Sequence, residues 1–394
     1  MKAGWAKTTI GATFTTVTGG TPSKSNEGFY GDFIPLVKPP ELRGSELDSA
    51  EDGLSEAGAA VARIAPRHSI LVSCIGNLGK VGLNTIPVAF NQQINAIFPD
   101  GDKALPSFML YQVLSCSFKE QLESQASGTT VPIVNKSKFN SIEIVLPPLS
   151  EQQRIVAILD EAFEAIAAAR ANAEQNRQNS RALFESYLQS VFSQRGKGWV
   201  DTTIGADVKF IDYRGKTPVK TECGVRLITA KNVKMGYIQE TPMEFIASEG
   251  YSNWMTRGIP KKGDVLFTTE APLANVAQLD TDEPVAFAQR VIIMQPNATK
   301  LNSTFLKYLL LSQPIQQRIR TKGTGATVQG IKASLLKQID ISFPPSLSEQ
   351  QQIVEQLDSL RDKTLRLESL YQRKIAALDE LRQSLLQQAF SGQL

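Results

Sequence analysis

The residues able to do chemistry are few and widely spaced. Histidine occurs once, as His68, which leaves no histidine pair for a metal site and no histidine base beside a nucleophile elsewhere. The cysteines Cys74, Cys116 and Cys223 form no CxxC pair, so the sequence suggests neither a disulfide framework nor a zinc site. The run 76–80 is too short for a phosphate-binding loop and lacks the Ser or Thr that follows its lysine. We therefore expect no catalytic residue, no metal and no cofactor bound by this chain.

Residues suited to nucleic-acid contact are more frequent. Lys and Arg bind phosphates, and Arg, Lys, Asn, Gln, Ser and Thr hydrogen-bond to base edges in the grooves of DNA. Two glycine–threonine loops, 127–131 and 324–328, can also offer backbone N–H groups to a phosphate. Each candidate has a plainer reading as a solvated loop residue, and each loop as a simple turn. The candidates are Lys24, Asn26, Tyr30, Lys38, Lys80 and Thr129 in the first half, and Lys216, Lys220, Arg226, Lys231, Asn232, Lys234 and Thr324 in the second.

Composition places the chain among soluble globular proteins. Its 394 residues leave room for two or three domains, with 42% hydrophobic and 21% charged residues. No apolar run is long enough to cross a bilayer, so we expect no membrane contact and a cytoplasmic protein. The net charge is only +3, but residues 197–347 hold 19 basic and 13 acidic residues, against 12 and 13 in residues 1–150. The second half is therefore compatible with a polyanionic partner.

Two helical segments of equal length must position these residues. They follow proline pairs and cover 147–192 and 344–390. Ser150 and Ser348, and likewise Phe192 and Phe390, are separated by 198 positions. A serine followed three residues later by glutamine predicts a capping box at Ser150–Gln153 and again at Ser348–Gln351. We expect two helices that pair with each other; the alternative is two unrelated amphipathic helices.

Apolar residues in these segments recur with alternating spacings of four and three, which is typical of a coiled-coil seam. The seam is weak at Asn176, Ser180 and Lys374. The predicted pairing residues are Ile155, Leu159, Ile166, Leu183 and Tyr187 in the first helix, and Leu357, Leu360, Leu367, Tyr371, Leu378, Leu381 and Leu385 in the second.

The rest of the chain is also repeated. TTIGA at 8–12 returns at 202–206, and the apolar runs near 67–83 and 262–280 are both typical of strands. We therefore predict an α+β tandem duplication, in which a mixed α/β domain and a long helix occur twice. The simplest pairing of the helices is an antiparallel coiled coil, with the domains at opposite ends and related by a pseudo-twofold axis. The predicted parts are 1–149 (domain), 150–196 (helix), 197–347 (domain) and 348–394 (helix).

The order of these motifs resembles that of one family, the specificity subunit of type I restriction-modification systems. The resemblance covers nearly the whole chain. It rests on GGTPS (19–23), GKTP (215–218), SCIGNLGKVG with FNQQ, and VLFTTEAPLANVAQ with AQR. SGTTV, TGATV, LPPLSEQQ, FPPSLSEQQ and the closing FSGQL complete it. Arg214 and Lys216 stand where the first half has glycines, so we expect the two domains to read different sequences.

The resemblance implies two target recognition domains, each reading half of a bipartite, asymmetric site in double-stranded DNA. It also implies that the paired helices act as spacer and docking surface for two methyltransferase (modification) subunits, which use S-adenosylmethionine, and that restriction (translocase) subunits join this DNA methylation complex. The chain itself would then be a non-catalytic subunit. A protein-binding scaffold of the same architecture is the competing hypothesis, and an enzyme without a recognisable motif is a weaker one.

Overall fold

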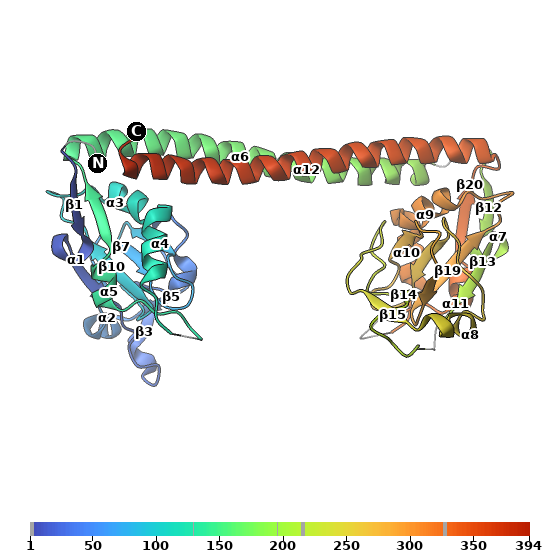
Figure 1. The fold of residues 1–394 in the computed structure, drawn as a ribbon, viewed down its shortest axis with the longest axis horizontal. Coiled ribbons are helices and arrows are strands. Elements are labelled where there is room, and N and C mark those ends of the chain that lie inside the picture. The colour runs from blue at the N-terminus through green and yellow to red at the C-terminus, as the bar shows by residue number, and fades with distance from the viewer. Residues whose placement is uncertain (1–3, 129, 195, 214–216, 326–328) are drawn as a thin grey trace. The chain divides into compact units, whose positions relative to one another are not determined.

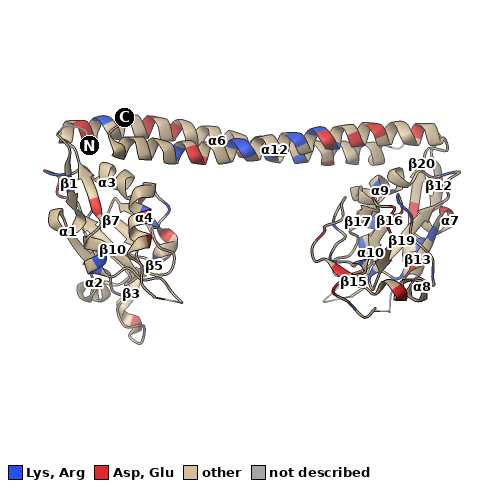
Figure 2. Cartoon of the chain, in the orientation of Figure 1, with Lys and Arg blue, Asp and Glu red and all other residues tan. Residues whose placement is uncertain are grey.

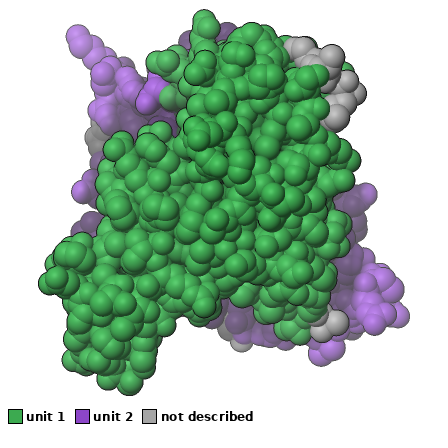
Figure 3. Space-filling view, turned by 90° about the vertical axis from the view of Figure 1, so that its left-hand side faces the viewer, with its two compact units in different colours: residues 1–174, 372–394 green, residues 175–371 purple. Residues whose placement is uncertain are grey.

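The fold contains the predicted duplication. The structure, a computed structural model, describes residues 4–128, 130–194, 196–213, 217–325 and 329–394. Its contacts divide the chain into two compact units, which Figure 3 colours separately. Unit 1 contains residues 1–174 and 372–394, and unit 2 contains residues 175–371. Each unit therefore joins one globular domain to part of both long helices.

The domain of unit 1 is built from antiparallel and parallel strands with short helices (Figure 1). A two-stranded sheet, β1 (Ala6–Thr9) and β11 (Glu143–Leu146), joins the two ends of the domain. The five-stranded sheet has the order β2 (Thr15–Thr18), β10 (Ile94–Phe98), β7 (Ile70–Ser73), β8 (Val81–Asn84) and β4 (Glu46–Leu47). The four-stranded sheet has the order β5 (Asp52–Leu54), β3 (Tyr30–Val37), β9 (Val88–Phe90) and β6 (Ile64–Ala65). The helices are α1 (Ile10–Thr13), α2 (Glu56–Val61), α3 (Pro106–Val113), α4 (Cys116–Ser124) and α5 (Lys136–Asn140).

The domain of unit 2 repeats this plan with one strand fewer in each of its two larger sheets. Its closing pair is β12 (Val200–Thr203) with β20 (Asp340–Phe343). The four-stranded sheet has the order β13 (Val208–Asp212), β19 (Val291–Pro296), β16 (Val265–Thr268) and β17 (Val276–Gln278). The three-stranded sheet has the order β15 (Glu244–Ile246), β14 (Val225–Ile228) and β18 (Val285–Phe287). The helices are α7 (Ile204–Asp207), α8 (Tyr251–Trp254), α9 (Ser303–Leu311), α10 (Gln313–Lys322) and α11 (Ala333–Lys337).

The two long helices are α6 (Leu149–Ser193) and α12 (Leu347–Ser391), and both contain 45 residues. They pair antiparallel, as predicted. In unit 1, Arg170 of α6 forms an ion pair of 3.2 Å with Asp379 of α12. In unit 2, Arg181 of α6 forms one of 2.6 Å with Glu368. Acidic and basic residues both occur along the two helices (Figure 2). Such exposed pairs contribute little free energy and mainly fix the orientation of the pairing.

The helices are held to each domain by apolar burial. Ile155 and Leu159 of α6, with Leu386 and Ala389 of α12, belong to the core of unit 1. Leu188 and Phe192 of α6, with Val354 and Leu357 of α12, belong to the core of unit 2. Fully burying a side chain of this size contributes about 1.5–3 kcal/mol. Each helix pair is therefore part of a domain core and not a separate rod.

The predicted seam is right in part. Ile155, Leu159, Ile166 and Leu357 are buried, whereas Tyr187, Leu360, Tyr371, Leu378 and Leu385 are half-buried. Leu183, Leu367 and Leu381 were wrongly assigned, because they are 52%, 37% and 47% exposed. Further buried positions include Val354, Thr364, Ile375, Leu386 and Ala389 in α12, and Ala173, Leu188 and Phe192 in α6. Ser180, which the sequence indicated as a weak position of the seam, is also buried.

The error has a geometric cause. A helix with 3.6 residues per turn drifts from a strict heptad, and here the buried stripe turns toward the domain. Phe184, Leu188 and Phe192, spaced by four, replace the expected position at Leu183, and they pack into the core of unit 2. The spacing alone therefore predicted the buried residues only where the stripe faces the other helix.

The capping boxes are also corrected. Both helices begin one residue before the predicted serines, so Ser150 and Ser348 lie inside the first turn. Glu151 and Gln152 instead donate their backbone N–H groups to the carbonyl of Pro148. In the second helix, Ser346 Oγ accepts from the N–H of Glu349 at 3.4 Å.

A buried glutamine occupies the first turn of each long helix. Gln152 is 0% exposed; its Oε1 accepts from Leu105 N at 2.9 Å, and its Nε2 donates to the carbonyls of Lys103 and Pro147 at 2.9 and 2.8 Å. Gln350 repeats all three bonds, with Asn302 N, Lys300 O and Pro344 O, at 2.7 to 2.8 Å. The glutamine thus ties the helix to the segment before α3 or α9.

We expect Gln152→Ala to lower the free energy of unfolding by about 2–4 kcal/mol, because it leaves buried backbone groups without partners. Gln153→Ala, at the exposed neighbouring position, should change it by less than about 0.5 kcal/mol. Denaturant unfolding of the two variants measures the difference. Equal stabilities would show that the Gln152 bonds do not hold helix and domain together.

Candidate nucleic-acid interface

Three loops that carry the repeated motifs meet in the domain of unit 1. The Gly-Gly-Thr loop lies against the loop after β9, because Gly20 N donates to Phe90 O at 2.9 Å and Thr21 Oγ1 to Gln92 Oε1 at 3.0 Å. The same β9–β10 loop bonds to the end of β7, where Cys74 N donates to Gln93 O at 2.7 Å. The loop 127–133 completes the group through Gly76 N, which donates to Pro132 O at 2.9 Å. Segments far apart in sequence thus form one surface.

The domain of unit 2 builds the same arrangement with other side chains. Gln289 Nε2 donates to Thr217 Oγ1, and Thr269 N donates to Arg290 O at 2.9 Å. Glu270 pairs with Gly330 in an antiparallel bridge. The equivalent of this bridge in unit 1 is Ile75 with Ile133. The backbone scaffold is therefore common to both domains.

The exposed side chains on these two surfaces differ in charge. Unit 2 presents Arg290, whose Nε lies 3.0 Å from Glu270 Oε1, and both side chains are about half exposed. The matching positions of unit 1 are Gln93 and Ile75. Arg290 was not among the predicted contacts, although AQR was noted as a motif opposite Asn-Gln-Gln. A bidentate guanidinium is the group best suited to guanine, whereas a glutamine amide suits adenine.

The candidates of unit 1 fall into two groups. Three of them stabilise the fold: Asn26 Oδ1 accepts from Gly28 N at 3.1 Å, Tyr30 Oη donates to Pro22 O at 2.9 Å, and Lys38 pairs with Asp52. Tyr30 thereby fixes the loop that follows Thr21. Lys24 is exposed and Lys80 half-exposed, so both stay candidates. Thr129 lies outside the described residues.

The candidates of unit 2 divide in the same way. Asn232 is 1% exposed, and its amide bonds to Thr229 N, Gln239 O and Pro242 O at 2.9–3.1 Å. It is therefore a structural residue, and its assignment as a base contact is withdrawn. Lys220 pairs with Glu244 at 2.7 Å. Lys216 lies outside the described residues.

Three cations and Thr324 remain available in unit 2. Lys231 is exposed, Lys234 is half-buried, and Thr324 is exposed next to its bridge with Gly330. Arg226 is half-buried, and its Nη2 is buried without a hydrogen-bond partner among the described residues. A buried guanidinium nitrogen without an acceptor costs free energy, which a bound phosphate oxygen would offset.

The surfaces offer no reactive group. Burial raises the pKa of the Cys74 thiol to about 12, which keeps it protonated and inert at neutral pH. Burial also raises the pKa of Asp264. Across the described ranges no group of His, Cys, Asp and Glu could hold a metal ion. Nor does any helix there have the length and apolar character to cross a membrane. The arrangement can bind a nucleic acid and distinguish its bases through hydrogen bonds and charge.

Comparison with known proteins decides the family. The family model described as "Type I restriction modification DNA specificity domain" matches residues 2–175 and 211–377. The chain belongs to this family. The predicted resemblance is thereby confirmed, and each copy of the specificity domain includes a globular domain and most of the long helix that follows it.

Two similar proteins are specificity subunits of type I restriction enzymes. The HindI specificity subunit of Haemophilus influenzae is 34% identical over 165 residues, which is 40% of this chain and 36% of that protein. The MjaVIII specificity subunit of Methanocaldococcus jannaschii is 28% identical over 308 residues, which is 72% of this chain and 68% of that protein. The two curated proteins are thus matched over about one third and two thirds of their lengths.

Solved structures share the fold of the specificity family. A chain from a study of complex assembly and conformational transition of the type I R-M system aligns with a TM-score of 0.82 and 20% identity, covering 100% of this chain and 99% of that one. The HsdS subunit of Thermoanaerobacter tengcongensis aligns with a TM-score of 0.64 and 19% identity, covering 100% and 98%. At these identities the likeness concerns the fold.

One glycine controls the loop contact in unit 1. A Cβ on Gly19 would lie 2.1 Å from Asn91 O and 2.4 Å from Phe90 O, whereas a Cβ on Gly20 meets nothing within 4 Å. We expect Gly19→Ala to cost about 1–3 kcal/mol of stability, since backbone must move, and to weaken recognition of one DNA half-site only. Gly20→Ala is the matched control and should behave like wild type in melting and in DNA-binding assays. If Gly19→Ala leaves both half-sites unaffected, this surface does not read DNA.

Proposed function

We propose that this chain is the sequence-reading subunit of a type I restriction-modification complex. Each three-loop surface reads one half of a bipartite, asymmetric site in double-stranded DNA. As a member of the specificity family, the chain supplies recognition and not catalysis. Methyl transfer belongs to two modification subunits that bind S-adenosylmethionine, and translocation and cleavage belong to restriction subunits. The complex acts on DNA in the cytoplasm.

A single observation carries this proposal: one backbone scaffold occurs in both domains with different exposed side chains. Thr21–Gln92 and Thr217–Gln289 hold equivalent loops, while Gln93 and Ile75 in unit 1 are replaced by Arg290 and Glu270 in unit 2. Two domains with a common frame and different reading groups suit two unlike half-sites. A protein scaffold would not need this pattern, and no observation favours it.

The long helices are the proposed docking surface for the modification subunits. Apart from Leu347 at the start of α12, five leucines on α6 and α12 are substantially exposed, and exposed apolar side chains can form a protein interface. Arg170 fits this role less well, because its side chain bridges to Asp379 and Glu174. Arg373 is exposed, as are the leucines. These leucines are Leu183 (52%), Leu365 (54%), Leu367 (37%), Leu370 (50%) and Leu381 (47%).

We expect Leu370→Ser and Leu381→Ser to weaken assembly with the modification subunit by about tenfold or more, because burying one leucine at an interface contributes about 1.5–3 kcal/mol. Helicity should be retained, since both side chains are exposed in this chain. Gln387→Ser, also exposed on α12, is the control. Size-exclusion chromatography and calorimetry measure the complex. Normal assembly of both leucine variants would place docking elsewhere.

We propose that the two helices of equal length set the distance between the half-sites. Each spans roughly 68 Å at about 1.5 Å per residue, and one added heptad lengthens it by about 10.5 Å. A heptad inserted after Glu174 and another after Tyr371 keeps the antiparallel pairing in register. The unread gap should then grow by about three base pairs of about 3.4 Å, with unchanged half-sites.

Methylation mapping of this double-insertion variant measures the gap directly. A heptad in one helix alone should destabilise the fold, because the partner helix cannot follow. Five residues added to both helices rotate the buried stripe by about 140° at 3.6 residues per turn and should also abolish activity. An active double-heptad complex with an unchanged gap would mean that these helices do not set the spacing.

A further inference from the structure

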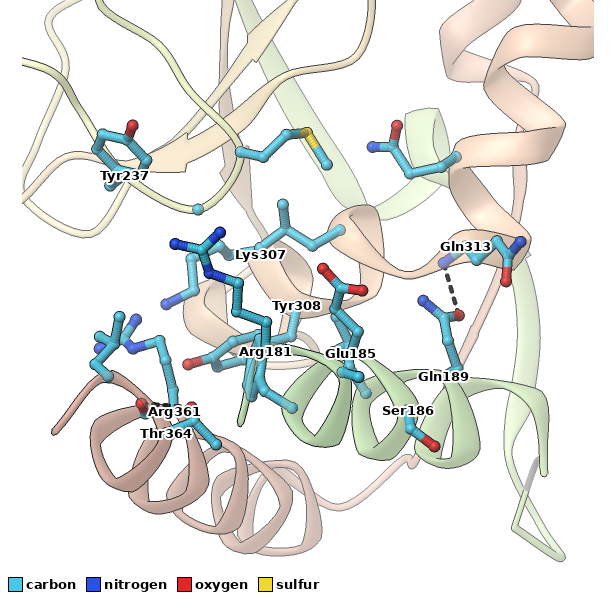
Figure 4. A pocket seen from close by; sticks show the side chains of 18 of the residues that line it. Arg181, Glu185, Ser186, Gln189, Tyr237, Lys307, Tyr308, Gln313, Arg361 and Thr364 are labelled. Carbon is cyan, nitrogen blue, oxygen red and sulfur yellow. Dashed lines mark hydrogen bonds between the residues drawn. The ribbon is translucent and has the colours of Figure 1, made fainter. Parts of the chain in front are cut away.

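A deep cleft lies within unit 2, where the helix pair meets the domain. It encloses about 1470 Å³, more than the roughly 300–1,000 Å³ of common ligand sites. Its walls come from four segments: α6 from Arg181 to Gln189, α9 and α10, the loop 235–237, and α12 from Arg361 to Glu368. Figure 4 shows these walls around the cleft, with Tyr237 opposite the two helices. The three loops described above take no part, but the loop 235–237 directly follows the candidate Lys234, whose N–H donates to Tyr237 O at 2.9 Å.

Cations dominate the polar lining. Four cationic and two acidic side chains face the cleft: Arg181, Lys307, Arg320 and Arg361, against Glu185 and Glu368. One acid is already occupied, because Glu368 pairs with Arg181 at 2.6 Å. In Figure 4 the side chains of Lys307, Arg181 and Arg361 point toward the same part of the cleft.

Lys307 is the unusual member of this set. Its residue is 4% exposed, and its ammonium lies 4.2 Å from the centre of the Tyr308 ring. Within the described chain no carboxylate comes within 4 Å of its ammonium. Tyr308 in turn donates to Asp358, which also lies 3.8 Å from Arg361. Burial, and then the charge of Arg361, lower the pKa of Lys307 to about 8. The charge of Asp358 offsets this effect only in part, and a bound anion would stabilise the buried ammonium further.

Two further polar atoms in the lining have no partner. Gln316 is 7% exposed; its Nε2 donates to Ala274 O and Leu310 O, but its Oε1 is buried and accepts nothing among the described residues. Arg361 Nε is likewise buried and unpaired. The lining therefore holds one acceptor and one donor without a partner among the described residues. Exposed Met235 (45%) and Tyr237 (58%) add apolar surface at the rim.

The same junction in unit 1 is filled differently. Leu110 and Phe163 occupy the positions of Lys307 and Arg361, 197 and 198 residues earlier. Phe163 packs edge-on against Tyr111 at 5.3 Å, and Arg382 lies 4.9 Å above its ring. The Tyr–Asp pair is kept, as Tyr111 with Asp160. The cationic cleft thus belongs to one repeat, which is not expected of a surface that binds one of two identical partners.

We propose that this cleft binds a small phosphorylated molecule with an aromatic or apolar part, of the size of a mononucleotide. The ammonium of Lys307 and the guanidinium groups of Arg361 and Arg320 hold the phosphate through charge-assisted hydrogen bonds. Tyr237 and Met235 cover the apolar part, and Gln316 Oε1 accepts from a donor on the ligand. The site is separate from the DNA-reading surfaces.

Isothermal titration calorimetry of the full chain with AMP, inorganic phosphate and adenosine tests the proposal. AMP should bind at one saturable site, and adenosine at least tenfold more weakly. Lys307→Met keeps the buried stem but removes the charge, and it should lower AMP affinity by about 10- to 100-fold. Arg373→Gln, an exposed cation of unit 1, is the control and should leave affinity unchanged. Phosphate binding as tight as that of AMP would overturn the part of the proposal in which Tyr237 and Met235 bind an aromatic or apolar group.

The pH dependence identifies Lys307 as the group responsible. The second phosphate pKa is about 6, so the charge of AMP is constant above pH 7.5. Lys307 loses its proton as pH rises through about 8, and wild-type affinity should therefore fall by tenfold or more between pH 7.5 and about 9.5. Lys307→Met should show no such fall. The charged groups that face Lys307 are Arg361 and Asp358 on α12, Arg181 and Glu185 on α6, and Arg320 on α10.

Folding is checked separately. Lys307→Met should melt no lower than wild type, because it removes a buried charge, and its complex should recognise both DNA half-sites normally. If Lys307→Met does unfold, Arg320→Gln, at an exposed position of the lining, replaces it and should also weaken AMP binding. The proposal is overturned if folded wild-type chain binds neither AMP nor phosphate at millimolar concentration, or if the cleft variants bind AMP like wild type.

Discussion

Everything in this molecule depends on the attachment of each long helix to its domain. One buried glutamine makes the polar part of that attachment, with two bonds to the backbone before α3 or α9 and one to the proline carbonyl in the turn before its own helix. Apolar residues from both helices complete it inside the domain core. A hinge at this point would make the length of the helices irrelevant to the position of the reading loops. With the glutamine in place, the helix end and the domain are one packed body.

A second constraint follows from duplication. In both domains a threonine–glutamine side-chain bond holds the first loop, and backbone bonds hold the other two. The backbone bonds do not depend on which side chains the loops expose. The exposed positions are therefore able to change without loss of the fold, as the pairs Gln93/Arg290 and Ile75/Glu270 illustrate. The cleft of unit 2 has the same explanation: the backbone arrangement is shared by both domains, whereas the side chains on it differ. Its Tyr–Asp pair is shared with unit 1, whereas Lys307 and Arg361 are not.

Sequence alone predicted the repeated parts of the molecule. The helices of equal length, their antiparallel pairing and the mixed α/β domains followed from motif order and spacing. The exposed Leu183 and the buried Asn232 were misjudged, because spacing does not say which neighbour covers a residue. The role of Gln152 was not predicted, since the backbone groups that it binds come from about 50 residues earlier and from the preceding turn. The sequence did not predict the cleft, because its lining residues come from four separate segments: Arg181, Tyr237, Lys307 and Arg361.

The central claim is that two unlike domains on one helix pair read a single DNA site in two halves. Methylation mapping of host DNA, with this gene present and deleted, tests it most directly. The account predicts one motif with two different half-sites and a fixed unread gap, methylated only when the gene is present. Methylation that survives the deletion, or a lost motif that is continuous or symmetric, would contradict it.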